Sequence, residues 1–109
     1  INVSATCVRV PVKTGHAESI NIEFVNPYNL ANVKKILEES PGCKVVDEHK
    51  DGGYMTPIEV EGDYTTYISR IRKDNSNVKA INLWVVSDNL LKGAALNTIQ
   101  IAERLMKKS

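Results

Sequence analysis

The sequence has 109 residues, of which 42% are hydrophobic and 25% are charged, enough for one small domain with an apolar core. Its 14 basic and 13 acidic residues leave a formal net charge of +1, which gives no electrostatic reason to expect nucleic acid or an anionic membrane as a partner. No run approaches the roughly 18 apolar residues of a membrane helix, and two cysteines are too few for a disulfide scaffold. We therefore expect a single cytoplasmic domain spanning residues 1–109.

The first quarter of the chain predicts two strands. Residues 2–12 are rich in Val and Thr, and Pro11, which cannot donate to a ladder, marks the end of that strand. A Lys-Thr-Gly turn follows at residues 13–15. Residues 17–25 alternate apolar and polar side chains, the pattern of a strand with one buried face and antiparallel neighbours. Because the chain opens directly in a strand, we expect it to be part of a larger fold.

The middle of the chain predicts a helix, a short strand and a loop. Asn29 is a good N-cap for an amphipathic helix over residues 30–40, which a Pro-Gly pair ends. Residues 44–47 predict a short strand. Residues 48–56 are polar and contain two glycines, which is typical of a mobile loop.

The last part predicts two strands and a helix. Residues 64–73 are rich in Thr, Tyr and Ile, and residues 80–86 are more continuously apolar, as in a central strand covered on both faces. Residues 91–107 carry an apolar stripe at helical spacing, and either Asp88 or Asn89 is suited to cap that helix.

The predicted order of elements is β-β-α-β-β-β-α, with room for one further short strand before residue 64. This order indicates an α+β domain in which helices cover one face of a sheet. Trp84 is expected in the core.

His16 and Arg9 are the strongest candidates for chemistry. His16 follows Gly15 in a tight turn, and an imidazole is the side chain best suited to moving a proton near neutral pH. Arg9 lies seven residues upstream in an apolar segment, and a guanidinium grips a carboxylate with two parallel hydrogen bonds. An ordinary turn histidine and an arginine in a structural salt bridge remain the alternatives.

The other reactive side chains have simpler interpretations. Cys7 and Cys43 are expected to be inert thiols, Cys7 buried beside Arg9 and Cys43 packed at a helix end. His49 is expected to be a solvated loop residue. A strand segment with three basic residues allows an anion contact, but a solvated strand face is the simpler explanation for Arg70, Arg72 and Lys73. No glycine-rich nucleotide loop occurs in the sequence.

Several segments resemble the C-terminal domain of aspartate-β-semialdehyde dehydrogenases. They are RVPVKTGHAE, DNLLKGAALNTIQIAE, SATCVRVPV and SRIRKD, and together they cover essentially the whole chain in order. Ser69, where this family often has glycine, is a minor departure. The resemblance implies the mixed, largely antiparallel sheet of a glyceraldehyde-3-phosphate-dehydrogenase-like C-terminal domain, without the N-terminal Rossmann domain.

The resemblance also implies roles for three residues. Family members interconvert aspartyl-β-phosphate and aspartate-β-semialdehyde with NADPH, on the route to lysine, threonine and methionine. Arg9 matches the arginine that holds the substrate carboxylate, His16 matches the general acid/base, and Asn89 falls where a polar side chain lies near the cofactor. The nucleophilic cysteine belongs to an Asn-Cys motif upstream, so neither Cys7 nor Cys43 takes that role.

The resemblance finally implies partners. NADP would be bound mainly by the N-terminal domain of the same enzyme, and family members are homodimers or homotetramers in which this sheet forms much of the interface. A fragment without that domain is expected to be inactive alone. Two alternatives remain: a non-catalytic amino-acid-binding or dimerisation module, and a related acyl-phosphate reductase such as the one acting on N-acetylglutamyl phosphate.

Overall fold

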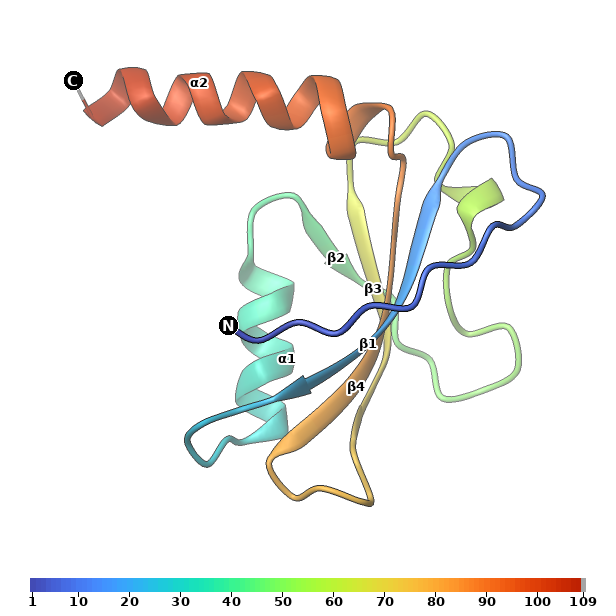
Figure 1. Ribbon diagram of the computed structural model, residues 1–109, viewed down its shortest axis with the longest axis vertical. Helices are drawn as coiled ribbons and strands as arrows, with labels where there is room; N and C mark the ends of the chain where they lie inside the picture. Colours follow the sequence, from blue (N-terminus) through green and yellow to red (C-terminus); the bar gives the residue numbers. More distant parts are fainter. Residues whose placement is uncertain (109) are drawn as a thin grey trace.

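The computed structural model describes residues 1–108. In chain order its elements are β1 (His16–Glu23), α1 (Leu30–Glu39), β2 (Cys43–Val45), the 3₁₀ turn η1 (Pro57–Glu59), β3 (Thr66–Lys73), β4 (Ala80–Ser87), the π-helical turn η2 (Leu91–Ala95) and α2 (Leu96–Lys108) (Figure 1). Every predicted element after residue 16 is confirmed to within a few residues. The further short strand allowed before residue 64 is absent; that stretch holds only η1 among the described elements.

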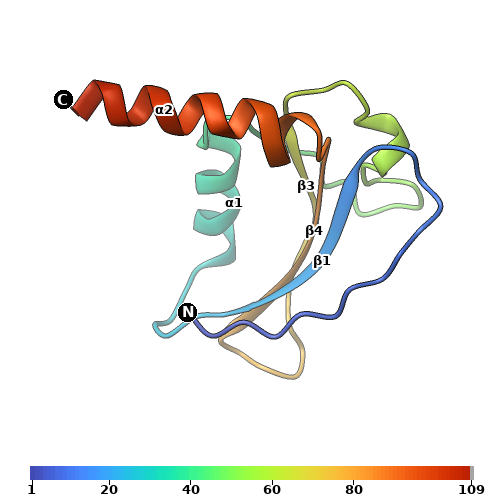
Figure 2. The same ribbon diagram turned by 45° about the horizontal axis from the view of Figure 1, so that its top comes forward.

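The four strands form one mixed sheet in the order β1-β4-β3-β2. β4 pairs antiparallel with both β1 and β3, while the short β2 runs parallel to β3. β4 is therefore central, as its apolar sequence predicts. α1 packs on one face of the sheet, so the α+β class with a largely antiparallel sheet is confirmed (Figures 1 and 2).

The core lies between α1 and the sheet. Side chains of β3 and β4 are buried there and meet the apolar face of the helix; they are Ile68, Ile71, Ile81 and Leu83, packed against Leu30, Val33 and Leu37. The helix begins where Asn29 caps it, because the Asn29 side chain accepts a hydrogen bond from the backbone N–H of Asn32 at 3.2 Å.

A second, smaller cluster lies around the ends of β3 and β4. Val60, Tyr67 and Val86 are buried in it. Trp84 packs against this cluster half-buried rather than in the main core, and its indole N–H donates to the Met55 carbonyl at 2.9 Å. The segment that contains Met55 is thereby attached to the sheet.

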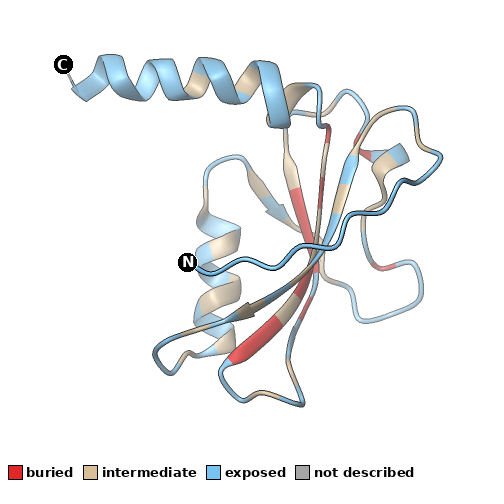
Figure 3. Cartoon of the chain, viewed as in Figure 1, coloured by how far each residue is buried: buried red, intermediate tan, exposed pale blue. Residues whose placement is uncertain are grey.

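The prediction of a strand over residues 2–12 is wrong. Residues 1–15 form neither helix nor strand, and Val3, Val8 and Val10 are exposed (Figure 3). A strand needs a neighbour for its backbone N–H and C=O groups, and this segment pairs with no strand among residues 1–108. The expected burial of Cys7 is wrong for the same reason, since its side chain is exposed.

The terminal helix α2 extends away from the sheet (Figures 1 and 2). Its predicted apolar stripe is present but uncovered: Ile99 is 57% exposed and Met106 is 74% exposed. The helices therefore do not both cover the sheet, because nothing within residues 1–108 packs on the outer half of α2. Of the helices in this described range, none is long and apolar enough to cross a membrane.

Candidate active site

A tight turn at Gly15 presents His16. The Gly15 φ angle is +104°, a conformation that side-chain-bearing residues rarely adopt. A Cβ added at Gly15 would lie 2.7 Å from Cβ of Pro57 and 3.1 Å from its Cα. Glycine is therefore required both by the backbone angle and by the close approach of η1.

The η1 turn is itself held in place. Glu59 accepts hydrogen bonds from the backbone N–H of Thr56 at 2.8 Å and from its hydroxyl at 2.7 Å. These two bonds lower the pKa of the Glu59 carboxyl, so the turn that backs Gly15 carries a stable negative charge at its start.

His16 begins β1 opposite Ser87, the last residue of β4. Its Nε2 lies 2.8 Å from Oε1 of Glu18, which is two residues along the strand and so on the same face. In the neutral imidazole, an N–H at Nε2 donates to Glu18 and leaves Nδ1 as the free acceptor. The His16 side chain is 61% exposed, so it is accessible to a ligand or to a second protein surface.

Asn89 ties the end of β4 to the turn before His16. The Asn89 Oδ1 accepts the backbone N–H of Gly15 at 2.8 Å, across 74 residues of sequence. Neither predicted cap, Asp88 or Asn89, is the N-cap residue, which is Leu90. Asp88 still binds the helix start, because its Oδ1 accepts from the backbone N–H groups of Leu90 at 2.8 Å and Leu91 at 3.2 Å.

Asp88 also connects this corner, formed by Gly15, His16 and Asn89, to the segment after η1. The Asp88 residue is 3% exposed, and its Oδ2 accepts the backbone N–H of Gly62 at 2.8 Å. The bond from Gly62 lowers the pKa of Asp88; burial opposes it, and the N–H groups of Leu90 and Leu91 add to the lowering. Asp88 is therefore a charged connector that fixes where Asn89 sits.

Arg9 is not brought into this corner. It is exposed within the irregular first segment, and across residues 1–108 it makes no hydrogen bond or ion pair. The salt-bridge alternative for Arg9 is thus not realised within this chain. Of the three predicted site residues, the structure joins His16 and Asn89 through Gly15 and leaves Arg9 apart.

The two cysteines, Cys7 and Cys43, are free thiols. No cluster of three His, Cys, Asp or Glu side chains within residues 1–108 is arranged to hold a metal ion. Beside His16, the exposed Asn89 amide is a polar group that a nicotinamide cofactor could contact.

Two residues of the site are missing from the sequence-based prediction, Glu18 and Pro57. The spacing of His16 and Glu18, two residues apart on a strand, is a signal that identifies Glu18 as a neighbour. Pro57 lies 42 positions from Gly15 in the sequence, and nothing local indicates their contact.

The corner has the chemistry of proton transfer. An accessible imidazole is oriented through one nitrogen by a carboxylate, and its backbone is fixed by a glycine turn, a proline and an amide. The described residues near His16 include no nucleophile with an activating base. The arrangement therefore gives His16 the geometry to exchange a proton with a bound group.

Known proteins match this chain closely. The family model described as "Semialdehyde dehydrogenase, dimerisation domain" matches residues 1–92. The aspartate-semialdehyde dehydrogenase of Rickettsia bellii is 50% identical over 107 residues, 98% of this chain and 32% of that protein, and that of Bacillus subtilis is 44% identical over 108 residues, 98% of this chain and 31% of that protein.

Solved structures of aspartate semialdehyde dehydrogenases also match this chain. Aspartate semialdehyde dehydrogenase II of Vibrio cholerae, complexed with ASA, superposes with a TM-score of 0.84 at 40% identity, over 94% of this chain and 30% of that one. This chain thus spans about a third of the length of its relatives. It belongs to the semialdehyde dehydrogenase family and corresponds to the dimerisation domain of its aspartate-semialdehyde dehydrogenases.

Proposed function

We propose that this chain is the C-terminal part of an NADP-dependent aspartate-semialdehyde dehydrogenase and supplies His16 as its general acid/base. The reaction is the interconversion of aspartyl-β-phosphate with aspartate-β-semialdehyde and phosphate. The observation that carries the proposal is the corner at His16, where an accessible imidazole is oriented by Glu18 and its turn is fixed by Asn89 and Pro57. Conversion of an acyl phosphate or thioester to an aldehyde requires such a proton donor and acceptor.

His16 would act through Nδ1, the nitrogen that Glu18 leaves free. When a thiol of the N-terminal domain adds to the aldehyde, Nδ1 of the neutral imidazole would take the thiol proton, and the imidazolium would then pass it to the developing oxyanion; in the opposite direction the same proton would return to the sulfur through His16. Glu18 keeps the ring in one tautomer and stabilises the imidazolium. NADPH, when bound, would supply the hydride that reduces the acyl group to the aldehyde, and Asn89 would offer its Nδ2 amide to the nicotinamide end.

Arg9 would hold the α-carboxylate of the substrate. Its guanidinium has no partner within residues 1–108, so it is available for a bidentate carboxylate contact. Since the first segment pairs with nothing here, the approach of Arg9 to His16 must come from packing against the N-terminal domain.

The surfaces that this chain leaves uncovered fit two kinds of partner. The apolar side chains of α2 and of the first segment would pack on the N-terminal domain of the same subunit, and the sheet face away from α1 on a second subunit, giving a homodimer or homotetramer. Part of that sheet face is polar and hydrogen-bonded, because Asn21 donates to Asn82 at 3.0 Å and to Asp74 at 2.7 Å. Trp84 and Val86 lie on the same face. Such a partly polar surface suits an interface that forms after each subunit has folded.

Both thiols are free, which supports a cytoplasmic location on the route to lysine, threonine and methionine.

Neither alternative is favoured by a specific observation. The relatives at 44 to 50% identity are aspartate-semialdehyde dehydrogenases rather than N-acetylglutamyl-phosphate reductases or regulatory modules.

A chimeric enzyme tests the proposal. The segment of the Bacillus subtilis enzyme that aligns with this chain would be replaced by residues 1–109, and NADPH-dependent turnover of the chimera measured. We expect His16→Ala to lower kcat by about 10²- to 10⁴-fold, the usual contribution of a positioned general acid/base. Arg9→Lys should chiefly raise KM, because an ammonium cannot make the bidentate contact.

The matched control is Lys79→Ala, an exposed position beyond the opposite end of β1. It should leave turnover unchanged. A chimera in which His16→Ala is as active as Lys79→Ala would remove His16 from its proposed role.

A further inference from the structure

The turn at Gly15 is supported from two directions. Asn89 accepts the Gly15 backbone N–H at 2.8 Å, and Pro57 lies behind the turn, 2.7 Å from the place of an added Cβ. The two supports belong to different segments of the chain, the connection between β4 and η2 and the turn η1. The position of His16, the next residue, therefore depends on how these two segments are held relative to each other.

Asp88 is the side chain that joins the two segments. Its Oδ1 accepts the backbone N–H groups of Leu90 at 2.8 Å and Leu91 at 3.2 Å, at the start of η2. Its Oδ2 accepts the backbone N–H of Gly62 at 2.8 Å, in the loop that follows η1. One oxygen thus serves the segment of Asn89 and the other serves the segment of η1.

Gly62 is firmly attached to Pro57. The backbone N–H of Val60 donates to the Pro57 carbonyl at 3.3 Å, and the backbone N–H of Asp63 donates to the Val60 carbonyl at 3.0 Å. Val60, which links these two consecutive turns, is fully buried. A displacement of Gly62 would therefore displace Pro57 as well.

The start of a helix does not account for the choice of aspartate at position 88. A helix start needs one acceptor oxygen, which asparagine or serine also provides. Asp88 is buried, and a carboxylate has acceptors on both oxygens, whereas an amide would place an NH2 donor against one of the backbone N–H groups. The hydrogen bond from Gly62 contributes most to lowering the pKa of Asp88, so that its carboxyl stays ionised at neutral pH. Aspartate is thus the residue type that a connection between two segments requires.

We propose that Asp88 is a positioning residue that acts on His16 through the Gly15 turn, a role that rests on the proposed function of His16. By joining the loop after η1 to the start of η2, Asp88 sets the spacing of the two supports of that turn, Asn89 and Pro57. A misplacement of a catalytic group by about 1 Å can cost about 10²-fold in rate. A buried side chain that contacts neither substrate nor cofactor can therefore still determine the rate.

Asp88→Asn in the chimeric enzyme tests this role. The substitution keeps the shape of the side chain but replaces one acceptor oxygen by an NH2 group. We expect kcat to fall about tenfold or more, while KM for aspartate-β-semialdehyde stays within about twofold, because Arg9 is not attached to this corner. Asp88→Ser, which keeps one acceptor for the helix start and leaves Gly62 without one, should lower kcat similarly, and it replaces Asp88→Asn if that variant does not fold.

The same substitution in a His16→Ala background separates positioning from a general role in folding. If Asp88 acts through His16, Asp88→Asn should lower the kcat of His16→Ala by no more than about twofold, because residues that act as a unit are not additive. A role in folding alone would lower kcat by the same factor in both backgrounds. Equal losses in both, or an unchanged kcat in the presence of His16, would overturn the role of Asp88 and leave that of His16 intact. If His16→Ala itself leaves kcat unchanged, the proposed function fails and the role of Asp88 fails with it.

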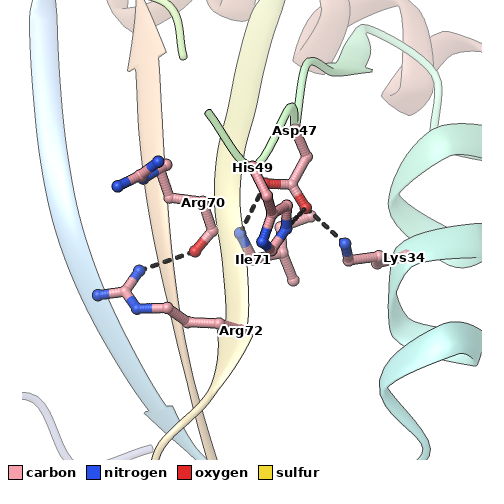
Figure 4. Close-up of polar contacts among 6 residues, drawn as sticks. All are labelled: Lys34, Asp47, His49, Arg70, Ile71 and Arg72. Atoms are coloured by element: carbon pink, nitrogen blue, oxygen red, sulfur yellow. Dashed lines mark hydrogen bonds and ion pairs between the residues drawn. The ribbon is translucent and has the colours of Figure 1, made fainter. Parts of the chain in front are cut away.

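Asp47 provides the matched control (Figure 4). Its side chain is also buried, and its Oδ1 accepts a backbone N–H, that of Ile71 at 3.2 Å in the bulge of β3. Its Oδ2 binds Lys34 and His49, so that Asp47 connects β3 to α1 and to the loop after β2 rather than to the corner. Asp47→Asn should therefore lower the urea midpoint of unfolding and yet leave kcat of the chimera within about twofold. A fall in kcat as large as that of the Asp88 variants would show that loss of any buried carboxylate is sufficient, and would overturn the positioning role.

Discussion

The close contact of Gly15 with Pro57 makes a quantitative prediction. Gly15→Ala places a methyl group 2.7 Å from Pro57 Cβ, at a residue whose φ is +104°. An L-residue at positive φ costs about 1–2 kcal/mol, overpacking costs about 1–3 kcal/mol, and the stiffer unfolded chain returns about 0.4–1 kcal/mol. We therefore expect the free energy of unfolding to fall by about 2–4 kcal/mol, measured by urea denaturation followed by circular dichroism.

A matched glycine separates the two costs. Gly52 also has a positive φ, +70°, but a Cβ added there meets nothing within 4 Å. Gly52→Ala should therefore show only the conformational cost, and the difference between the two variants should be the contact with Pro57, about 1–3 kcal/mol. If Gly15→Ala destabilises no more than Gly52→Ala, the reasoning that η1 backs the His16 turn is refuted.

Three further predictions concern other parts of the chain. Glu18→Gln should lower kcat of the chimera by about 2- to 5-fold without changing KM, because an exposed ion pair contributes little more; no change would show that Glu18 does not orient His16. The pKa of Asp47 is lower in the folded chain than in the unfolded chain, where it is about 4. Its ionised carboxylate therefore stabilises the fold above that pH, and this stabilisation is lost as the pH falls through the folded pKa. In denaturant titrations, Asp47→Asn should be less stable at pH 7 and should lack this acid-dependent loss of stability. Ile71→Ala should destabilise the fold by about 2–5 kcal/mol, and Ile36→Ala, at a 63% exposed position, by less than about 0.5 kcal/mol; similar losses for both would place the core elsewhere.

Local patterns determined most of the secondary structure. The alternation in β1, the Asn29 cap of α1 and the apolar run of β4 each depend on residues close together in sequence, and the structure has all three elements. The same patterns identified His16 as a turn residue suited to moving a proton, and the relatives confirm the family resemblance, while the role of His16 stays a proposal.

Strand pairing and side-chain burial could not be predicted from local sequence patterns. Residues 2–12 have strand composition, but a strand exists only where a neighbour takes its hydrogen bonds, and no such neighbour lies in residues 1–108. For the same reason the apolar stripe of α2 correctly predicts a helix but does not predict which surface covers that stripe. The bulge at Arg70 has no local signal either, because it follows from the register of β3 against β4.

The sequence by itself determined the elements after residue 16 and the fold class, because these depend on short-range periodicity, while motif spacing made His16 and Arg9 the candidates that are proposed for the site. Only the tertiary structure decided that Asn89 fixes the Gly15 turn, that Pro57 backs it and that Asp88 binds the loop at Gly62. These contacts join residues dozens of positions apart, and their geometry depends on how the strands meet.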